Sequence, residues 1–353
     1  MLLIVHEQVE RHLCRPLPHD PRPVVSDISE GVDLRRYDNG KVGVSGTLYC
    51  GNAHQCPVCR VHIASGRQQE IDKALLEAQQ LGWHAYFLTL TLPHGLSDRL
   101  QVLWSELRSS YGRLFGGRNA TWIKAQGYQG RISSFDVTHG GTNGWHPHLH
   151  VLIFFDRPVP ESFQRELFRL WEKALAKHDR LPNESAFRFL SLSDNLQETS
   201  RVAAYMSKGS TEELSSSPWS VADELTASHV KNSDSGLTVD QLIDSATAGY
   251  AEALDLLLEY FDASKGRQLI SWSKGLKALL SVHDRTDEEI LEEREKQGVL
   301  LGTLTHSQWV YVIETYNETR LLQAATQYGF LGALRVVAEA KAQIMSRRRS
   351  VTA

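Results

Sequence analysis

The chain has few cysteines and no long apolar run, and each of these absences excludes a class of protein. It also has no overall excess of basic residues. It contains 4 cysteines among 353 residues, too few for a small secreted scaffold held together by disulfides. No apolar stretch approaches the roughly 20 residues that a transmembrane helix needs. The first residues lack the basic start and the small-residue cleavage site of a signal peptide. We therefore expect a cytoplasmic protein.

The formal net charge of −4 does not by itself indicate a nucleic-acid partner. The charge is unevenly distributed, however, because residues 60–131 are net basic and residues 209–300 are strongly acidic. The central part could therefore face phosphates, whereas the later part is not expected to do so. The chain is long enough for several domains and shows no internal repeat.

The four cysteines all lie in roughly the first sixth of the chain, which favours a metal site over disulfides in the cytosol. Cys56-Pro-Val-Cys59 is expected to form a tight turn that aims two thiolates at one point, as tetrahedral zinc requires. Cys50 is a natural third ligand. The candidates for the fourth ligand are Cys14, His54 and His62. A fourth thiolate is favoured because structural zinc sites often close with four of them, and such a site should be structural.

Hydrophobic periodicity predicts alternating helices and strands. Strands are expected at residues 84–92, 131–138, 145–155 and 187–192. Helices are expected at residues 65–81, 97–115, 160–178, 196–208 and 238–261, with two or three more after about residue 285. The expected fold is α+β, an antiparallel sheet flanked by helices. Its expected regions are a zinc module (1–65), a catalytic domain (66–208), a linker with a helix and a basic segment (209–285) and a C-terminal helical region (286–353).

The strand expected at residues 145–155 has the sequence WHPHLHVLIFF. Residues two apart on a strand point to the same face, so His148 and His150 present two imidazoles side by side. Two neutral imidazoles make half of a transition-metal site. If the preceding hairpin folds about residue 142, Asp136 lies opposite His148 and can add a carboxylate. His146 is the competing third ligand.

The helix expected at residues 196–208 places Tyr205 and Lys208 three residues apart, on one surface. A tyrosine hydroxyl, with a pKa of about 10, is a poor nucleophile at neutral pH. It can attack a phosphodiester if a metal polarises the phosphate, while Lys208 stabilises the phenolate or holds the phosphate. The products would be a 5′-phosphotyrosine link and a free 3′-hydroxyl, and the nick could be resealed without ATP.

Three motifs in this order make the chain resemble the HUH endonucleases: FLTLT at residues 87–91, HPHLH at 146–150 and YMSK at 205–208. It is most similar to the rolling-circle replication initiators of small plasmids and some viruses. The early cysteines and the GRxxxxWSxGL segment at residues 266–276 also resemble the plasmid Rep branch of actinobacteria and related groups.

The resemblance implies that His148 and His150 bind Mn²⁺ or Mg²⁺ and that Tyr205 is the nucleophile. Asp136 stands where relatives tend to carry a glutamate. Some relatives have a glutamate one helical turn before the tyrosine, which activates water and ends replication. Arg201 occupies that position here. Glu198, two helical turns before the tyrosine, could activate the water instead.

The expected function is therefore strand-specific nicking of DNA at a replication origin, with covalent attachment of the protein. Expected partners are single-stranded or supercoiled origin DNA, with the host helicase and polymerase. The residues expected to contact DNA are Arg267, Trp272 and Lys274, although Trp272 could instead close the core. One alternative is a transposase or mobilisation relaxase with the same chemistry. The other is a non-catalytic, zinc-containing DNA-binding regulator in which Tyr205 is structural.

Overall fold

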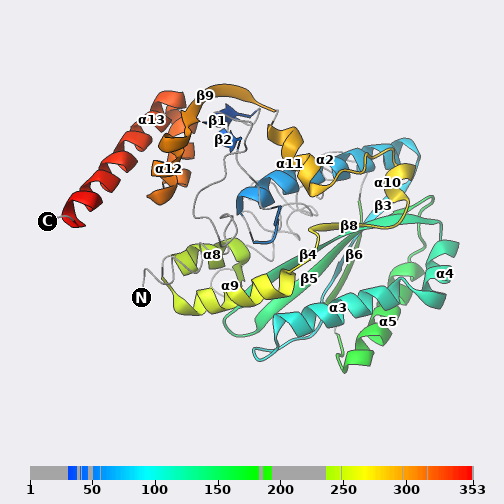
Figure 1. The fold of residues 1–353 in the computed structure, drawn as a ribbon. Helices are drawn as coiled ribbons and strands as arrows, with labels where there is room; N and C mark the ends of the chain where they lie inside the picture. The colour runs from blue at the N-terminus through cyan, green and yellow to red at the C-terminus, as the bar shows by residue number, and fades with distance from the viewer. Residues whose placement is uncertain are drawn as a thin grey trace. The chain divides into compact units, whose positions relative to one another are not determined.

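The structure is a computed structural model that describes a defined subset of the chain. The described residues are 31–37, 40, 42–46, 51–55, 57–182, 186–192, 236–247, 249–295, 297–315 and 317–351. They form two compact units (Figure 1). The first unit lies within residues 53–284, and the second combines the described residues before 53 with those after 284. The second unit is therefore discontinuous in the sequence.

The first unit is built on a six-stranded sheet with the order β6-β3-β5-β4-β7, in which β8 also pairs with β4. Every neighbouring pair is antiparallel. The strands are β3 (His84–Leu90), β4 (Tyr128–Gly140), β5 (Gly144–Phe155), β6 (Phe187–Ser191), β7 (Leu237–Thr238) and β8 (Ile270–Trp272). The α+β fold with an antiparallel sheet is thus confirmed.

Helices cover both faces of this sheet (Figure 1). They are α2 (Pro57–Gln80), α3 (Leu100–Leu114), α4 (Gly117–Ala125), α5 (Ser162–Leu175), η1 (Ala176–His178), α8 (Val239–Thr247), α9 (Ala251–Ser264) and α10 (Leu276–Leu279). On one face, Ile71 of α2 packs into an apolar cluster with Phe87 and Leu152. On the other face, the ring of Phe163 in α5 contacts that of Phe155 at a centroid distance of 5.3 Å.

Two boundaries differ from the sequence prediction. Helix α2 begins at Pro57, so the last residues of the Cys-Pro-Val-Cys motif start a helix instead of forming the predicted turn. Proline suits the first helical position, where its missing N–H would have no partner. The helix predicted at 238–261 is two helices, because Gly249 adopts a positive φ of 96° between them. Thr238 and Gln241 form a capping box at the start of α8, with reciprocal bonds of 2.9 and 3.2 Å.

The second unit contains a three-stranded antiparallel sheet with the order β2-β1-β9. Its elements are β1 (Gly31–Arg36), β2 (Val42–Ser45), α11 (Asp287–Glu295), β9 (Val299–Thr305), α12 (His306–Glu314) and α13 (Glu318–Val351). The helices predicted after about residue 285 are present as α11, α12 and α13, but the prediction omitted β9, which lies between α11 and α12. That strand pairs with β1, and the hydroxyl of Thr303 donates to Asp33 at 2.7 Å, 270 residues away. A local pattern does not reveal so distant a partner.

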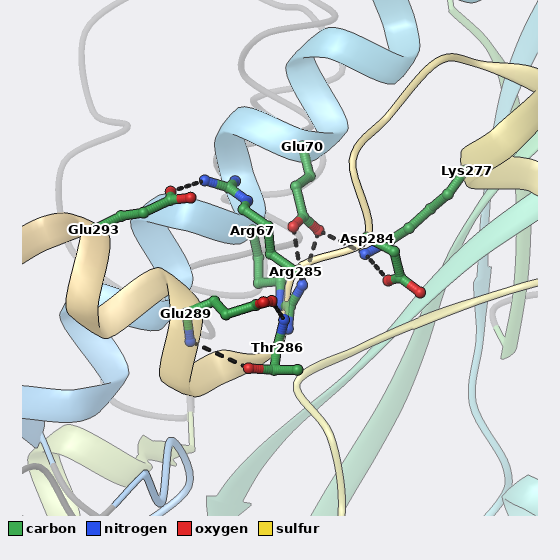
Figure 2. Close-up of polar contacts among 8 residues, drawn as sticks. All are labelled: Arg67, Glu70, Lys277, Asp284, Arg285, Thr286, Glu289 and Glu293. Atoms are coloured by element: carbon green, nitrogen blue, oxygen red, sulfur yellow. Dashed lines mark hydrogen bonds and ion pairs between the residues drawn. The ribbon is translucent and has the colours of Figure 1, made fainter.

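Polar contacts secure the start of α11 within this unit (Figure 2). The amide of Thr286 donates to the Glu289 carboxylate at 2.7 Å, and the amide of Glu289 donates back to the Thr286 hydroxyl at 3.1 Å. Arg285 pairs with Glu293 at 2.7 Å. The two bonds between Thr286 and Glu289 satisfy amide groups that the first helical turn leaves without intrahelical acceptors. Within the part of the chain that the structure describes, no helix is long and apolar enough to cross a membrane.

A buried carboxylate ties α2 to α10 in the first unit (Figure 2). The side chain of Glu70 is only 2% exposed and pairs with Arg67 at 2.9 Å and with Lys277 at 3.2 Å. Lys277 also reaches Asp284 at 2.8 Å. Burying a charge is costly unless opposite charges and hydrogen bonds surround it, as they do here.

We expect the substitution Glu70→Ala to lower the free energy of unfolding by about 3 kcal/mol, because it leaves buried cations without their carboxylate. The midpoint of thermal unfolding of the full chain should fall by roughly 6–12 °C. The matched control is Glu166→Ala, which removes another i,i+3 partner of an arginine, on α5. Glu166 is 35% exposed, and exposed pairs contribute little. Equal shifts for the two variants would contradict the stabilising role of the Glu70 contacts.

Candidate functional site

The hairpin of β4 and β5 carries the candidate site. The two strands pair along nearly their whole length, and Asp136 lies directly opposite His148. The register predicted from a fold about residue 142 is thus the one observed. Gly144, at the start of β5, has a positive φ of 68°. A Cβ at this position would lie only 3.0 Å from the Cα of Leu96, so glycine allows a close backbone approach.

One face of the sheet changes from apolar to polar along β5. Leu152 and Phe154 join the apolar cluster under α2. From His150 toward the hairpin turn, the same face carries imidazoles at every second residue, since side chains alternate along a strand. These imidazoles belong to His150, His148 and His146 and form the histidine row. The rings of His148 and His150 are nearly parallel with centroids 5.9 Å apart, and the ring of His146 lies 4.2 Å from that of His148. The predicted alignment of His148 and His150 is confirmed.

His150 is held firmly in this row. Its side chain is only 4% exposed, and its ring stacks on that of Phe87 at a centroid distance of 5.5 Å. Its Nδ1 is hydrogen-bonded to the hydroxyl of Thr89 at 3.2 Å. Both partners lie on β3, in the FLTLT segment. That segment therefore supports His150 through ring packing and a hydrogen bond.

The residue types around His148 fit a divalent metal, since two imidazoles and the carboxylate of Asp136 lie on one sheet face. Within the described ranges, however, no three His, Cys, Asp or Glu side chains converge as a group that could hold an ion. One oxygen of Asp136 accepts the amide N–H of Val137 at 2.8 Å. The donors are therefore adjacent, and a bound ion would require them to turn toward one point.

The structure adds a histidine to the site that the sequence did not indicate. His94 follows β3, and its Nε2 contacts the Nδ1 of His146. Burial, together with the charge that His94 can carry, lowers the pKa of His146 to about 4, so this imidazole is neutral at pH 7. The available signal was the position of His94, three residues after the FLTLT motif, at the end of a strand next to β5.

Several predicted site residues lie outside the described residues. These residues are Tyr205, Lys208, Glu198, Cys14, Cys50 and Cys56. Cys59 lies in the first turn of α2 and is fully buried. His54, one alternative zinc ligand, is also buried, and its Nδ1 is hydrogen-bonded to the hydroxyl of Tyr260 at 3.0 Å. Burial lowers the pKa of His54 to about 4. The zinc site stays a prediction.

The three residues predicted to contact DNA have different surroundings. Trp272 is half-buried against the apolar cluster under α2, and the ammonium of Lys277 lies 5.3 Å from its ring centre. The guanidinium of Arg267 lies 4.6 Å from the ring centre of Trp104 on α3. Lys274 is exposed. Trp272 therefore helps to close the core, and contact of these residues with DNA stays a prediction.

Comparison with known proteins identifies relatives of the chain. A protein family described as "Replication protein" matches residues 42–317. "Protein rep" of Streptomyces lividans is 26% identical over 318 residues, which cover 72% of this chain and 69% of that protein. "Neomycin resistance protein" of Streptomyces cyanogenus is 31% identical over 152 residues, which cover 36% of this chain and 35% of that protein. No solved structure matches.

The family match begins at β2, includes the whole β4–β5 hairpin and extends beyond α12. It therefore takes in residues of both compact units. The resemblance to plasmid replication proteins that the three motifs indicated is confirmed by this match. Because more than half of its residues match the family, the chain belongs to the replication protein family.

Proposed function

We propose that this protein initiates rolling-circle replication by nicking one DNA strand at an origin and remaining attached through Tyr205. Membership in the replication protein family supports the role of initiator. The chemistry rests on one structural observation, the β4–β5 register that sets Asp136 beside His148 on the face that also carries His150. This arrangement offers nitrogen and oxygen donors where a phosphate could be activated.

In this proposal His148 and His150 hold a divalent ion, with Asp136 or His146 as the third donor. When bound, Mn²⁺ or Mg²⁺ would polarise the non-bridging oxygens of the scissile phosphate and stabilise their charge. Imidazole donors favour Mn²⁺ in affinity, whereas Mg²⁺ suits oxygen donors. The stacking of His150 on Phe87 and its hydrogen bond to Thr89 would keep the His150 ring in place during the reaction.

The Tyr205 oxygen attacks phosphorus, and the bond from phosphorus to the 3′-oxygen breaks. The tyrosine proton leaves during the attack, and the departing 3′-oxygen gains one to become a hydroxyl. Lys208 stabilises the phenolate or contacts the phosphate. Rejoining is the reverse reaction, in which a 3′-hydroxyl attacks the phosphotyrosine. Because one phosphodiester replaces another, no ATP is needed.

Other parts of the proposal concern the end of the cycle and the partners. Glu198 is a candidate to activate water for release of the protein from DNA. The free 3′-hydroxyl would prime a host polymerase, with a host helicase opening the duplex. Zn²⁺ bound by the cysteines Cys14, Cys50, Cys56 and Cys59 would stabilise the N-terminal part of the chain.

A gel assay tests the proposal. The purified full chain is mixed with single-stranded DNA that carries the candidate origin, labelled at either end, with Mn²⁺ or with EDTA. With Mn²⁺, we expect the 3′-labelled fragment to migrate with the protein on a denaturing gel. The 5′-labelled fragment should be free, shorter and extendable by a polymerase. EDTA should abolish both products.

The alternatives predict other results. DNA binding that is insensitive to EDTA, without any adduct on the origin, would contradict the enzyme and favour a zinc-containing regulator. Cleavage at an element end or a transfer origin, with the replication origin left intact, would favour a transposase or relaxase.

A further inference from the structure

The loop after β3, residues 91–99, lies against the turn of the β4–β5 hairpin. The ring of His94 in this loop donates from Nδ1 to the carbonyl oxygen of Asn143 in the turn, at 2.9 Å. Backbone atoms also approach closely, since a Cβ at Gly144 would lie 3.1 Å from the carbonyl oxygen of Gly95. The loop and the turn that precedes the histidine row are therefore in direct contact.

The residues on both sides of His94 are anchored. Arg180 donates to the carbonyl of Pro93 at 3.0 Å and to both carboxylate oxygens of Asp98, at 2.8 and 3.2 Å. Asp98 in turn accepts the amide N–H of Gly95 at 2.9 Å. A bidentate, charge-assisted contact such as that between Arg180 and Asp98 is among the strongest kinds of hydrogen bonding in proteins. They fix the backbone that carries His94.

These contacts determine which ring nitrogens carry protons when both histidines are neutral. His94 must keep its proton on Nδ1, because a carbonyl oxygen can only accept. Its Nε2 then has a lone pair and accepts a hydrogen bond from the Nδ1–H of His146. The proton of His146 is therefore on Nδ1, and its lone pair is on Nε2. Within the described part of the chain, the His146 ring makes this hydrogen bond to His94 and no other.

We propose that His94 is a positioning residue of the site, which holds His146 in the tautomer whose Nε2 can donate to a metal beside His148. Insofar as it concerns a metal, the inference rests on the function proposed above. The ring of His146 lies 4.2 Å from that of His148, so the two donors are neighbours. Residues that fix the tautomer of a ligating histidine usually change metal affinity by about 10–100-fold when they are replaced. In this proposal His146 is the third donor to the metal, and His94 in the loop after β3 holds its ring in position.

Two measurements without DNA test this role. In metal-free protein with ¹⁵N-labelled histidine, imidazole NMR should show the Nδ1–H tautomer of His146 and its loss in His94→Ala. Titration with Mn²⁺, followed by the EPR signal of the free ion, should show affinity reduced by about 10–100-fold in that variant. His94→Gln, whose carbonyl oxygen can accept the same N–H, should recover most of the affinity. The matched control is His84→Ala, an exposed histidine at the start of β3, which should bind like wild type.

Three outcomes would overturn the inference. They are an Nε2–H tautomer of His146 in the wild type, an unchanged Mn²⁺ affinity in His94→Ala, and a folded His94→Gln that binds as weakly as the alanine variant. If His94→Ala fails to fold, the wild-type tautomer and the glutamine variant decide the question. A protein that passes both tests yet forms no DNA adduct would refute the proposed nicking function while the role of His94 stands.

Discussion

Tyr205→Phe is expected to abolish the covalent protein–DNA adduct while origin binding remains within a few fold of wild type. The substitution removes only the phenolic oxygen, which is the atom proposed to attack phosphorus. The ring remains available for packing. Denaturing gels measure the adduct, and a mobility shift without denaturant measures binding. Metal binding in the absence of DNA should be unchanged, because the metal donors proposed here are on other residues.

The control for this variant is Tyr250→Phe, which removes the hydroxyl of a tyrosine that is 67% exposed. It should form the adduct at the wild-type rate. An adduct that survives Tyr205→Phe would support the same reaction class but show that another residue is the nucleophile. Equal loss of adduct and of native DNA binding would instead indicate that Tyr205 is structural.

His150→Ala is expected to slow adduct formation by about 10³-fold, because the site loses a nitrogen donor to the ion. Such an ion stabilises the transition state by several kcal/mol, and about 4 kcal/mol corresponds to a factor of roughly 10³. Higher concentrations of Mn²⁺ should restore part of the rate if affinity is the main loss. The partly buried hydroxyl of Thr89 also loses a partner, so thermal unfolding must show that the variant is folded at the assay temperature.

The matched control is His139→Ala, on the same hairpin. His139 lies one residue out of phase with Asp136 and Thr138, so its side chain points to the opposite face of the sheet. There its ring contacts that of Trp145 at a centroid distance of 4.9 Å. This variant should form the adduct normally. Equal rates for His150→Ala and wild type would exclude His150 from the metal site, and equal losses in both variants would indicate general damage to the hairpin.

Part of the site could be predicted because it depends on local pattern alone. The alternation of side chains along a strand placed His148 and His150 on one face, and a short hairpin loop paired Asp136 with His148. Strand β3, which supports His150, could also be predicted from the sequence pattern of residues 84–92. The ordered motifs also indicated the family, which the match over residues 42–317 confirms.

Other features depend on residues that are far apart in the chain. The β1–β9 pairing joins segments about 270 residues apart, and the Glu70–Lys277 ion pair links α2 to a helix that follows the whole sheet. The contact of His94 with His146 requires the β3 loop to fold against the hairpin turn. None of these contacts leaves a periodic pattern in the sequence.

The sequence by itself therefore determined the antiparallel α+β class, the register of the central hairpin and the shared face of its histidines. These follow from strand periodicity and turn length, which act over a few residues. Only the tertiary structure decided which distant segments form the second unit and which residue supports His146. Those choices depend on packing and hydrogen bonding between surfaces that meet after the chain has folded.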